Sequence, residues 1–200
     1  MKKTYLILAV ILAGLIDCRA TVTIQPGSAG WGDSTTASVN GMTWGIVVNG
    51  AGATFAGTAV ADLSVALEGF SIPAFSTPST PLQIGASDYY FINAQTLTSN
   101  SGPPTFTNGF MNSVTFNLTG VVGTGDAAGL LWFAEGTTTA GSHFGFQDLG
   151  QLVPADGATI TTGWGGTPSL ANNVIGVPEP SRLVFLAFGV LGIFLRRRRC

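Results

Sequence analysis

The sequence predicts an all-β body, an antiparallel β-sandwich or jelly roll, between an N-terminal signal helix and a C-terminal transmembrane helix. Two observations on the middle of the 200-residue chain predict this fold class. Glycine, threonine, serine, alanine and asparagine dominate it, and short runs of β-branched and aromatic residues recur between turn signals. Helix-period stretches of useful length are absent from the sequence. A β-helix is the alternative, although no repeat of fixed period supports it.

Residues 1–20 have the layout of a secretory signal peptide. Met1 to Lys3 is positively charged, residues 5–16 are apolar, and a more polar stretch ends at Ala20. We expect cleavage after Ala20, because Cys18 and Ala20 put small side chains at the third and first positions before the cut. Lipidation of Cys18 is an alternative, but Asp17 stands where such signals have glycine, alanine or serine. The segment implies passage through the secretion machinery.

Residues 21–176 are long enough to bury one core, and we expect them to form a single β-rich domain. The clearest strand is Ser113–Val122, where apolar residues at 114, 116 and 118 alternate with polar residues at 115, 117 and 119. The other predicted strands are Thr21–Ile24, Met42–Val48, Leu63–Phe70, Tyr89–Thr98, Leu130–Ala134, His143–Leu149 and Ala158–Thr162.

Turn residues separate these strands at Asn49-Gly50, Ser101–Pro104, Asn108-Gly109 and Asp156-Gly157. The longest such stretch is Pro73–Pro81, which has three prolines among serine and threonine. It predicts a long loop that crosses between two sheets, and a linker between two domains is the alternative.

The charge of the body is one-sided. Residues 21–176 contain no lysine or arginine and eight acidic side chains, which gives a formal charge of −8 with His143 neutral, although the whole chain carries −2. The basic residues all lie toward the two ends, at Lys2, Lys3, Arg19, Arg182 and Arg196–Arg199. Such a body repels phosphate backbones and anionic lipid, so the sequence excludes nucleic-acid binding.

Catalytic candidates are few. Gly32-Asp33-Ser34 resembles the nucleophile block of one esterase family, in which the serine is paired with a C-terminal Asp-x-x-His motif. Here Ala140 stands three residues before His143, the sole histidine, so the aspartate is missing. A serine nucleophile needs both a base and a group that orients it. We therefore predict no catalytic residues and a protein that is not an enzyme, with His143 at a strand edge.

Metal-ligating patterns are equally sparse. One histidine and no cysteine in residues 21–176 exclude the usual zinc ligand sets. Calcium is the remaining metal, held by a carboxylate such as Asp126 in Gly123–Asp126 with backbone carbonyls, but no Asp-x-Asp-x-Asp-Gly loop is present. The expectation is that the protein has no cofactor.

Four tryptophans are candidates for stacking on sugar rings. We expect Trp44 and Trp132 to pack in the core, Trp132 because it lies in the apolar run Leu130–Phe133. Trp31 and Trp164 each stand beside glycine in a loop-like context and are the better candidates for glycan contact.

The tail, residues 177–200, combines three parts. Val177-Pro178-Glu179-Pro180 should be extended and exposed, because proline fixes φ, lacks a backbone N–H and disfavours helix in the residue before it. Residues 181–195 predict a transmembrane helix whose thirteen apolar residues span only ~20 Å of a ~30 Å hydrocarbon core. Arg196, Arg197, Arg198 and Arg199 then retain the C-terminal end in the cytoplasm, which leaves the body outside.

This succession of Val177-Pro178-Glu179-Pro180, a hydrophobic helix and a terminal arginine block resembles the PEP-CTERM sorting domain of Gram-negative bacteria. The resemblance implies recognition by an exosortase, a membrane-embedded processing enzyme, at or near Pro178-Glu179-Pro180. It also implies an exported protein linked to extracellular polysaccharide and biofilm, held in the inner membrane until it is processed. It implies nothing about the activity of residues 21–176.

Three functions follow from the sequence. The leading hypothesis is a non-enzymatic surface or extracellular-matrix protein, transiently membrane-anchored and then processed. The second is a carbohydrate-binding module that uses Trp31 and Trp164. The third is a hydrolase of ester or glycoside substrates that depends on Ser34 or on a carboxylate.

Overall fold

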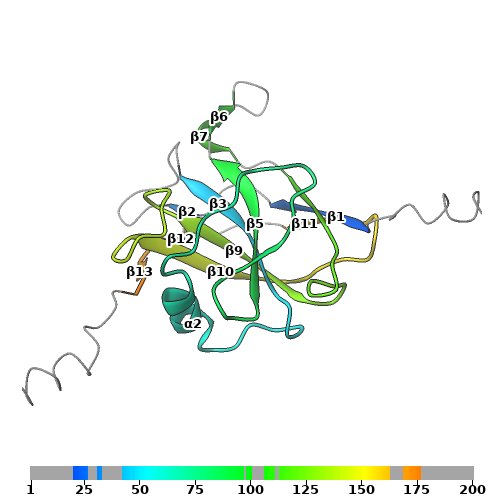
Figure 1. The fold of residues 1–200 in the computed structure, drawn as a ribbon. Helices are drawn as coiled ribbons and strands as arrows, with labels where there is room; N and C mark the ends of the chain where they lie inside the picture. Colours follow the sequence, from blue (N-terminus) through cyan, green and yellow to red (C-terminus); the bar gives the residue numbers. More distant parts are fainter. Residues whose placement is uncertain are drawn as a thin grey trace, which may run out of the picture.

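The computed structural model describes residues 20–26, 31–32, 42–96, 98–100, 106–110, 113–162 and 169–176, and it confirms a β-rich body. Figure 1 shows the strands and one short helix of this part of the chain. In chain order the elements are β1 (Thr21–Pro26), β2 (Trp31–Gly32), β3 (Thr43–Asn49), α2 (Ala59–Ala66), β4 (Leu82–Gln83), β5 (Tyr89–Thr96), β6 (Thr98–Asn100), β7 (Phe106–Phe110), β8 (Val114–Asn117), β9 (Ala127–Phe133), β10 (His143–Leu152), β11 (Thr159–Thr162), β12 (Ser169–Leu170) and β13 (Asn173–Val174).

The largest sheet has six strands in the order β13-β10-β9-β3-β5-β4, and every neighbouring pair in it is antiparallel. This pairing differs from the parallel stacking of a β-helix, the alternative architecture. Both outermost strands, β4 and β13, are only two residues long. The four strands between them, β10, β9, β3 and β5, are much longer, so most of the ladder hydrogen bonds lie in the middle of the sheet.

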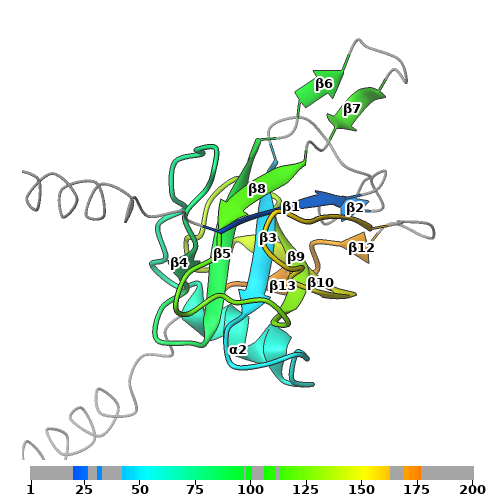
Figure 2. The same ribbon diagram turned by 90° about the vertical axis from the view of Figure 1, so that its right-hand side faces the viewer.

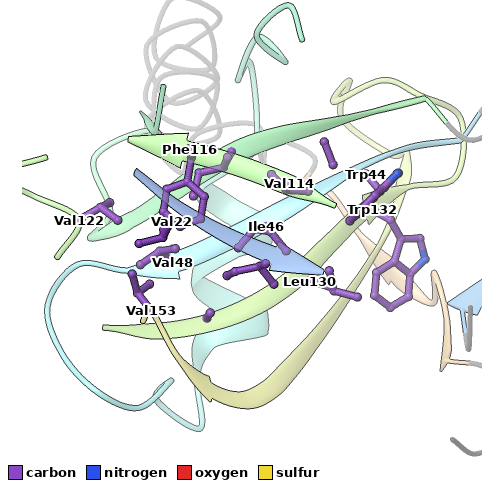
Figure 3. Close-up of a cluster of buried hydrophobic side chains, with 14 of the residues drawn as sticks. Val22, Trp44, Ile46, Val48, Val114, Phe116, Val122, Leu130, Trp132 and Val153 are labelled. Atoms are coloured by element: carbon purple, nitrogen blue, oxygen red, sulfur yellow. The ribbon is translucent and has the colours of Figure 1, made fainter. Parts of the chain in front are cut away.

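A three-stranded sheet, β11-β1-β8, lies over one face of the six-stranded sheet, as Figure 2 shows. Side chains of both sheets meet in a shared hydrophobic core, part of which is drawn in Figure 3. Val22 and Phe116 come from the smaller sheet, and Ile46, Leu130 and Trp132 come from the larger one. Their burial supplies the main driving force for packing the two sheets together.

The opposite face of the six-stranded sheet is covered by α2 and its flanking loops. A second core joins Leu63 and Leu67 to Val47, Phe91 and Phe133 of the sheet. Because both faces are covered, β9 is buried at all seven positions and β3 at six of seven. The two central strands therefore lack the alternation of apolar and polar residues that a half-exposed strand shows.

The strand predicted at Leu63–Phe70 is wrong, and so is the expectation that the body lacks a helix. The chain forms α2 at Ala59–Ala66. Ala59, Leu63 and Leu67 recur every four residues, which places them on one helical face, and all three are buried against the sheet. After the helix, Gly69 turns the chain at a φ of 71°, a conformation that glycine adopts without strain.

Two of the predicted turns are confirmed. Asn49-Gly50 leads into a turn closed by a bond from the Gly52 N–H to the Asn49 carbonyl, and Asp156-Gly157 lies in a turn closed by a bond from the Ala158 N–H to the Ala155 carbonyl. The turn predicted at Asn108-Gly109 is wrong, because these residues lie inside β7. Cross-strand pairing of β7 with β6 overrides their local preference for a turn. Ser101–Pro104 lies outside the described residues.

The predicted crossing loop at Pro73–Pro81 links the two sheets. Ser79 donates its N–H to the Thr115 carbonyl and accepts the Asn117 N–H, which ties the loop to β8 of the smaller sheet. The chain then enters β4 at the edge of the larger sheet. The loop therefore connects the smaller sheet to the edge of the larger one.

Ala20 and Gly176 are the described residues next to the two end segments. Strand β1 begins at Thr21, and the Gly176 N–H donates to the Ser64 carbonyl of α2 at 2.8 Å. Figure 1 places β1 and β13 on opposite sides of the body. The predicted signal helix up to residue 19 and the predicted membrane helix at 181–195 lie outside the described residues. Within the described ranges, no helix has both the length and the apolar character needed to cross a membrane.

Candidate functional site

An open pocket of about 750 Å³ lies between α2 and the turn that leads into β5. We call it the α2–β5 pocket. Its lining includes three carboxylates, Asp62, Glu68 and Asp88, together with Asn49 and Tyr89. Because residues 21–176 contain no lysine or arginine, no basic side chain of the body balances these charges.

Local hydrogen bonds fix the polar rim of this pocket. The Asn49 amide donates to the Thr54 carbonyl at 2.7 Å and accepts the Ala51 N–H at 3.1 Å. Asp62 accepts the Thr58 hydroxyl at 2.9 Å at the start of α2. The Asn49 amide thus holds the loop after β3, and Asp62 is tied to the first turn of the helix.

Tyr89 is a buried aromatic residue of the lining. Its side chain is 6% exposed, and its ring centroid lies 5.9 Å from that of Phe55. Burial raises the pKa of the Tyr89 hydroxyl above its ordinary value of 10.0, and the negative charges of Asp62 and Asp88 raise it further. The pocket therefore favours neutral or cationic groups and disfavours phosphate or carboxylate.

The described residues hold no group of three or more histidine, cysteine, aspartate or glutamate side chains that could bind a metal ion. Asp126, the carboxylate suggested for calcium, accepts the Gly123 N–H at 2.7 Å. That bond stabilises the turn between Gly123 and Asp126 in the manner typical of aspartate in turns.

Of the four tryptophans, the structure describes the side chains of two. Trp44 and Trp132 are each 1% exposed and face one another in register between β3 and β9, which confirms their place in the core. The backbone of Trp31 lies in β2, paired in parallel with Ser169 of β12. The Trp31 side chain and the whole of Trp164 lie outside what the structure describes, so no shared sugar-binding surface is defined for them.

His143 opens β10 and pairs with Val174 of the two-residue edge strand β13. Its ring Nδ1 lies 2.9 Å from Glu135 Oε1, and its backbone N–H donates to Glu135 Oε2 at 2.8 Å. Burial raises the pKa of Glu135, but the hydrogen bonds from His143 outweigh it, so the pKa lies below the ordinary 4.5. Ser34 lies outside the described residues, and the hydrolase hypothesis gains no support from the structure.

Sequence reasoning did not identify the Glu135–His143 pair. The signal was available, because the predicted strands Leu130–Ala134 and His143–Leu149 are antiparallel neighbours, and such a pairing brings the residues at the ends of their connection close together. The Glu135–His143 hydrogen bonds have a structural role, because they join the two ends of the β9–β10 connection at a solvent-exposed site.

The predicted sorting residues, Val177 to Pro180 and Arg196 to Arg199, lie outside the described residues. The predicted signal cleavage site is described on both sides of the scissile bond. The Ala20 carbonyl accepts the Leu118 N–H at 2.7 Å, and the Thr21 N–H donates to Asp156 Oδ1 at 3.0 Å. The first residue after the predicted cut is thus part of the folded body.

Comparisons with models of known protein families, with curated proteins and with solved structures found no match.

Proposed function

We propose that this chain is an exported, non-enzymatic protein whose β-sandwich body is delivered to the cell surface or extracellular matrix of a Gram-negative bacterium. Residues 1–20 direct export and are removed. Residues 177–200 then hold the body in the inner membrane until an exosortase cuts at or near Pro178-Glu179-Pro180. The mature protein associates with exopolysaccharide.

One observation from the fold supports the proposal above all others. Strand β1 starts at Thr21 and the Gly176 N–H donates to the Ser64 carbonyl, so the described residues beside both predicted processing positions are held by the fold. The named strands of both large sheets and the described residues of both cores lie between residues 21 and 176, so a body cut at these positions would keep them. The body's charge of −8 also keeps it from adhering to anionic lipid once it is released.

The experiment compares the full chain with a chain that lacks residues 177–200, each produced in exosortase-containing cells. The full chain should first fractionate with the inner membrane and then yield a shorter form outside the cell, whose intact mass locates both cuts. The truncated chain should bypass the membrane fraction. Unchanged localisation and processing of the truncated chain would contradict the proposal.

A second variant separates recognition from anchoring. Replacing Pro178 and Pro180 by alanine keeps the apolar segment and the arginine block while removing the extended motif. This variant should accumulate as a membrane-bound precursor, because it is anchored but not cut. A matched control, Pro73→Ala in the crossing loop, should be processed like the natural chain.

A second candidate function, recognition of a neutral carbohydrate by the body, is favoured by the α2–β5 pocket. Its three carboxylates can accept hydrogen bonds from sugar hydroxyls. If a glycan array finds a ligand, Asp88→Asn should weaken binding at the pocket, whereas Trp164→Ala should weaken it only if the predicted tryptophan contact is used. Asp148→Asn, an exposed carboxylate outside the pocket, serves as control. An array without any ligand would count against this function.

A further inference from the structure

The backbone nitrogen of Thr21 occupies a defined position beside a carboxylate. Its N–H donates to Asp156 Oδ1 at 3.0 Å, and the Thr21 carbonyl accepts the Gly157 N–H at 2.8 Å. In the adjacent strand β8, Asn117 is its register partner. All of these contacts come from residues 21–176, which remain after the signal segment is removed.

The turn that carries Asp156 is itself fixed. It is closed by the bond from the Ala158 N–H to the Ala155 carbonyl at 3.0 Å. Gly157 has a φ of 72°, which a glycine adopts without the strain that other residues would incur. The Asp156 carboxylate is thereby held at the start of β1.

We propose that removal of the signal segment turns this hydrogen bond into an ion pair between the new N-terminus and Asp156. The inference rests on the export proposal. Water adds across the Ala20–Thr21 peptide bond, Ala20 departs as a carboxylate, and Thr21 retains the nitrogen as a protonated α-amine. The ammonium then lies against Asp156 in the position that the amide N–H occupied.

The composition makes this ion pair unusual within the mature body. Residues 21–176 contain no lysine or arginine, so at neutral pH the α-ammonium is the main cation of a body that carries eight acidic side chains. Strands β8 and β11, which flank β1, carry no titratable side chain, and neither do residues 76–80 and 118–123. Among residues 153–162, Asp156 is the one titratable group that faces the nitrogen.

A nearby carboxylate favours the protonated amine, so it should raise the α-amino pKa above the usual ~8. The raised pKa makes the stability of the fold depend on pH. An amine with a raised folded-state pKa stabilises the fold fully below its unfolded-state pKa, and that stabilisation is lost as pH rises through the folded-state value. The ion pair also compensates for the bond between the Ala20 carbonyl and the Leu118 N–H, which the cut removes.

The protonation of the Thr21 α-amine can be measured directly by chemical labelling. Lys2 and Lys3 are the only lysines and leave with the signal segment, so the α-amine becomes the sole primary amine of the mature chain. The mature protein, produced by export of the full chain, is treated with an amine-methylating reagent over a range of pH, and mass spectrometry follows the label. The same measurement is made on Asp156→Asn, which keeps an acceptor oxygen for the Thr21 nitrogen, and on Glu68→Gln, which removes one charge from the α2 side.

We expect a single label at Thr21. Near neutral pH the native protein and Glu68→Gln should label about threefold more slowly than Asp156→Asn, since an exposed pair shifts a pKa by about half a unit. The difference should vanish in denaturant and diminish at high salt.

Equal labelling of native protein and Asp156→Asn, in chains that begin at Thr21, overturns the ion pair and leaves the export proposal intact. An exported chain that begins at another residue also overturns the ion pair, because Thr21 would then carry no ammonium. A chain that is never cut overturns both proposals.

Discussion

The contact between Gly145 and Trp132 shows how closely single residues constrain the core. These residues are register partners on β10 and β9, and a Cβ added to Gly145 would lie 2.0 Å from Trp132 Cε2. The absent side chain leaves the room that the indole ring fills on the same face of the sheet. The glycine is therefore required by packing, although nothing in its immediate sequence indicates this.

Gly145→Ala should destabilise the protein by about 1–3 kcal/mol, because the ring or the strand has to move to admit the methyl group. Denaturant unfolding measures the loss. Gly52→Ala is the matched control, since a Cβ at that position meets no atom within 4 Å. A Gly145→Ala variant as stable as the control would show that Trp132 has other room available.

Tyr89 offers a second prediction at the residue scale. Burial, with help from Asp62 and Asp88, holds its pKa above the ordinary 10.0. The unfolded chain ionises first on alkaline titration, so stability should fall as pH rises above about 10. Ultraviolet titration of the tyrosines checks this, with Tyr89→Phe identifying the signal. Asp88→Asn should lower the Tyr89 pKa, and an unchanged value would mean that burial alone sets it.

Among the elements, α2 is the clearest departure from what the sequence predicted. Leu63, Val65 and Leu67 alternate with Ser64, Ala66 and Glu68, which is the pattern of a strand. Leu63 and Leu67 also continue the four-residue spacing from Ala59, which is the pattern of a helix. The same residues satisfy both patterns, and only packing against the sheet distinguishes them: Leu63 is 0% exposed, whereas Val65 is 72% exposed.

That difference predicts the behaviour of two substitutions on one helix. Leu63→Ala should cost about 2–5 kcal/mol, because it leaves a cavity in the second core. Val65→Ala should change stability by less than about 0.5 kcal/mol, since the side chain is mostly in water. Thermal unfolding of the two variants is the measurement. Equal losses would argue for a strand at these residues, as the alternating pattern predicts.

The strands were more predictable than the site. Val114 and Phe116 alternate with polar residues, and the predicted strand there exists, although it ends at Asn117. The carboxylates of the α2–β5 pocket, in contrast, stand singly in the sequence at Asp62, Glu68 and Asp88. They meet only because α2 packs against the sheet beside the turn before β5. Proximity that depends on tertiary packing leaves no local pattern to detect.

At the scale of the whole molecule, the absence of lysine and arginine from residues 21–176 has a consequence for salt. Residues 21–176 can form almost no ion pairs that salt would screen, and they carry eight like charges that repel one another. Its unfolding temperature should therefore rise when sodium chloride is increased from low to physiological concentration. Scanning calorimetry tests this, with glucose of equal osmolarity as the control. A fall in unfolding temperature would indicate that attractive charge pairs dominate.

The two-residue strands at the outer edges of the six-stranded sheet affect how readily the protein aggregates at high concentration. An open sheet edge is a template on which another chain can add a strand, and repeated addition builds fibres. Here the edge strands are Leu82–Gln83 in β4 and Asn173–Val174 in β13. Each has too few backbone N–H and carbonyl groups to pair with a long incoming strand. A protein shaped in this way can be packed at high local density and still resist polymerising through this sheet.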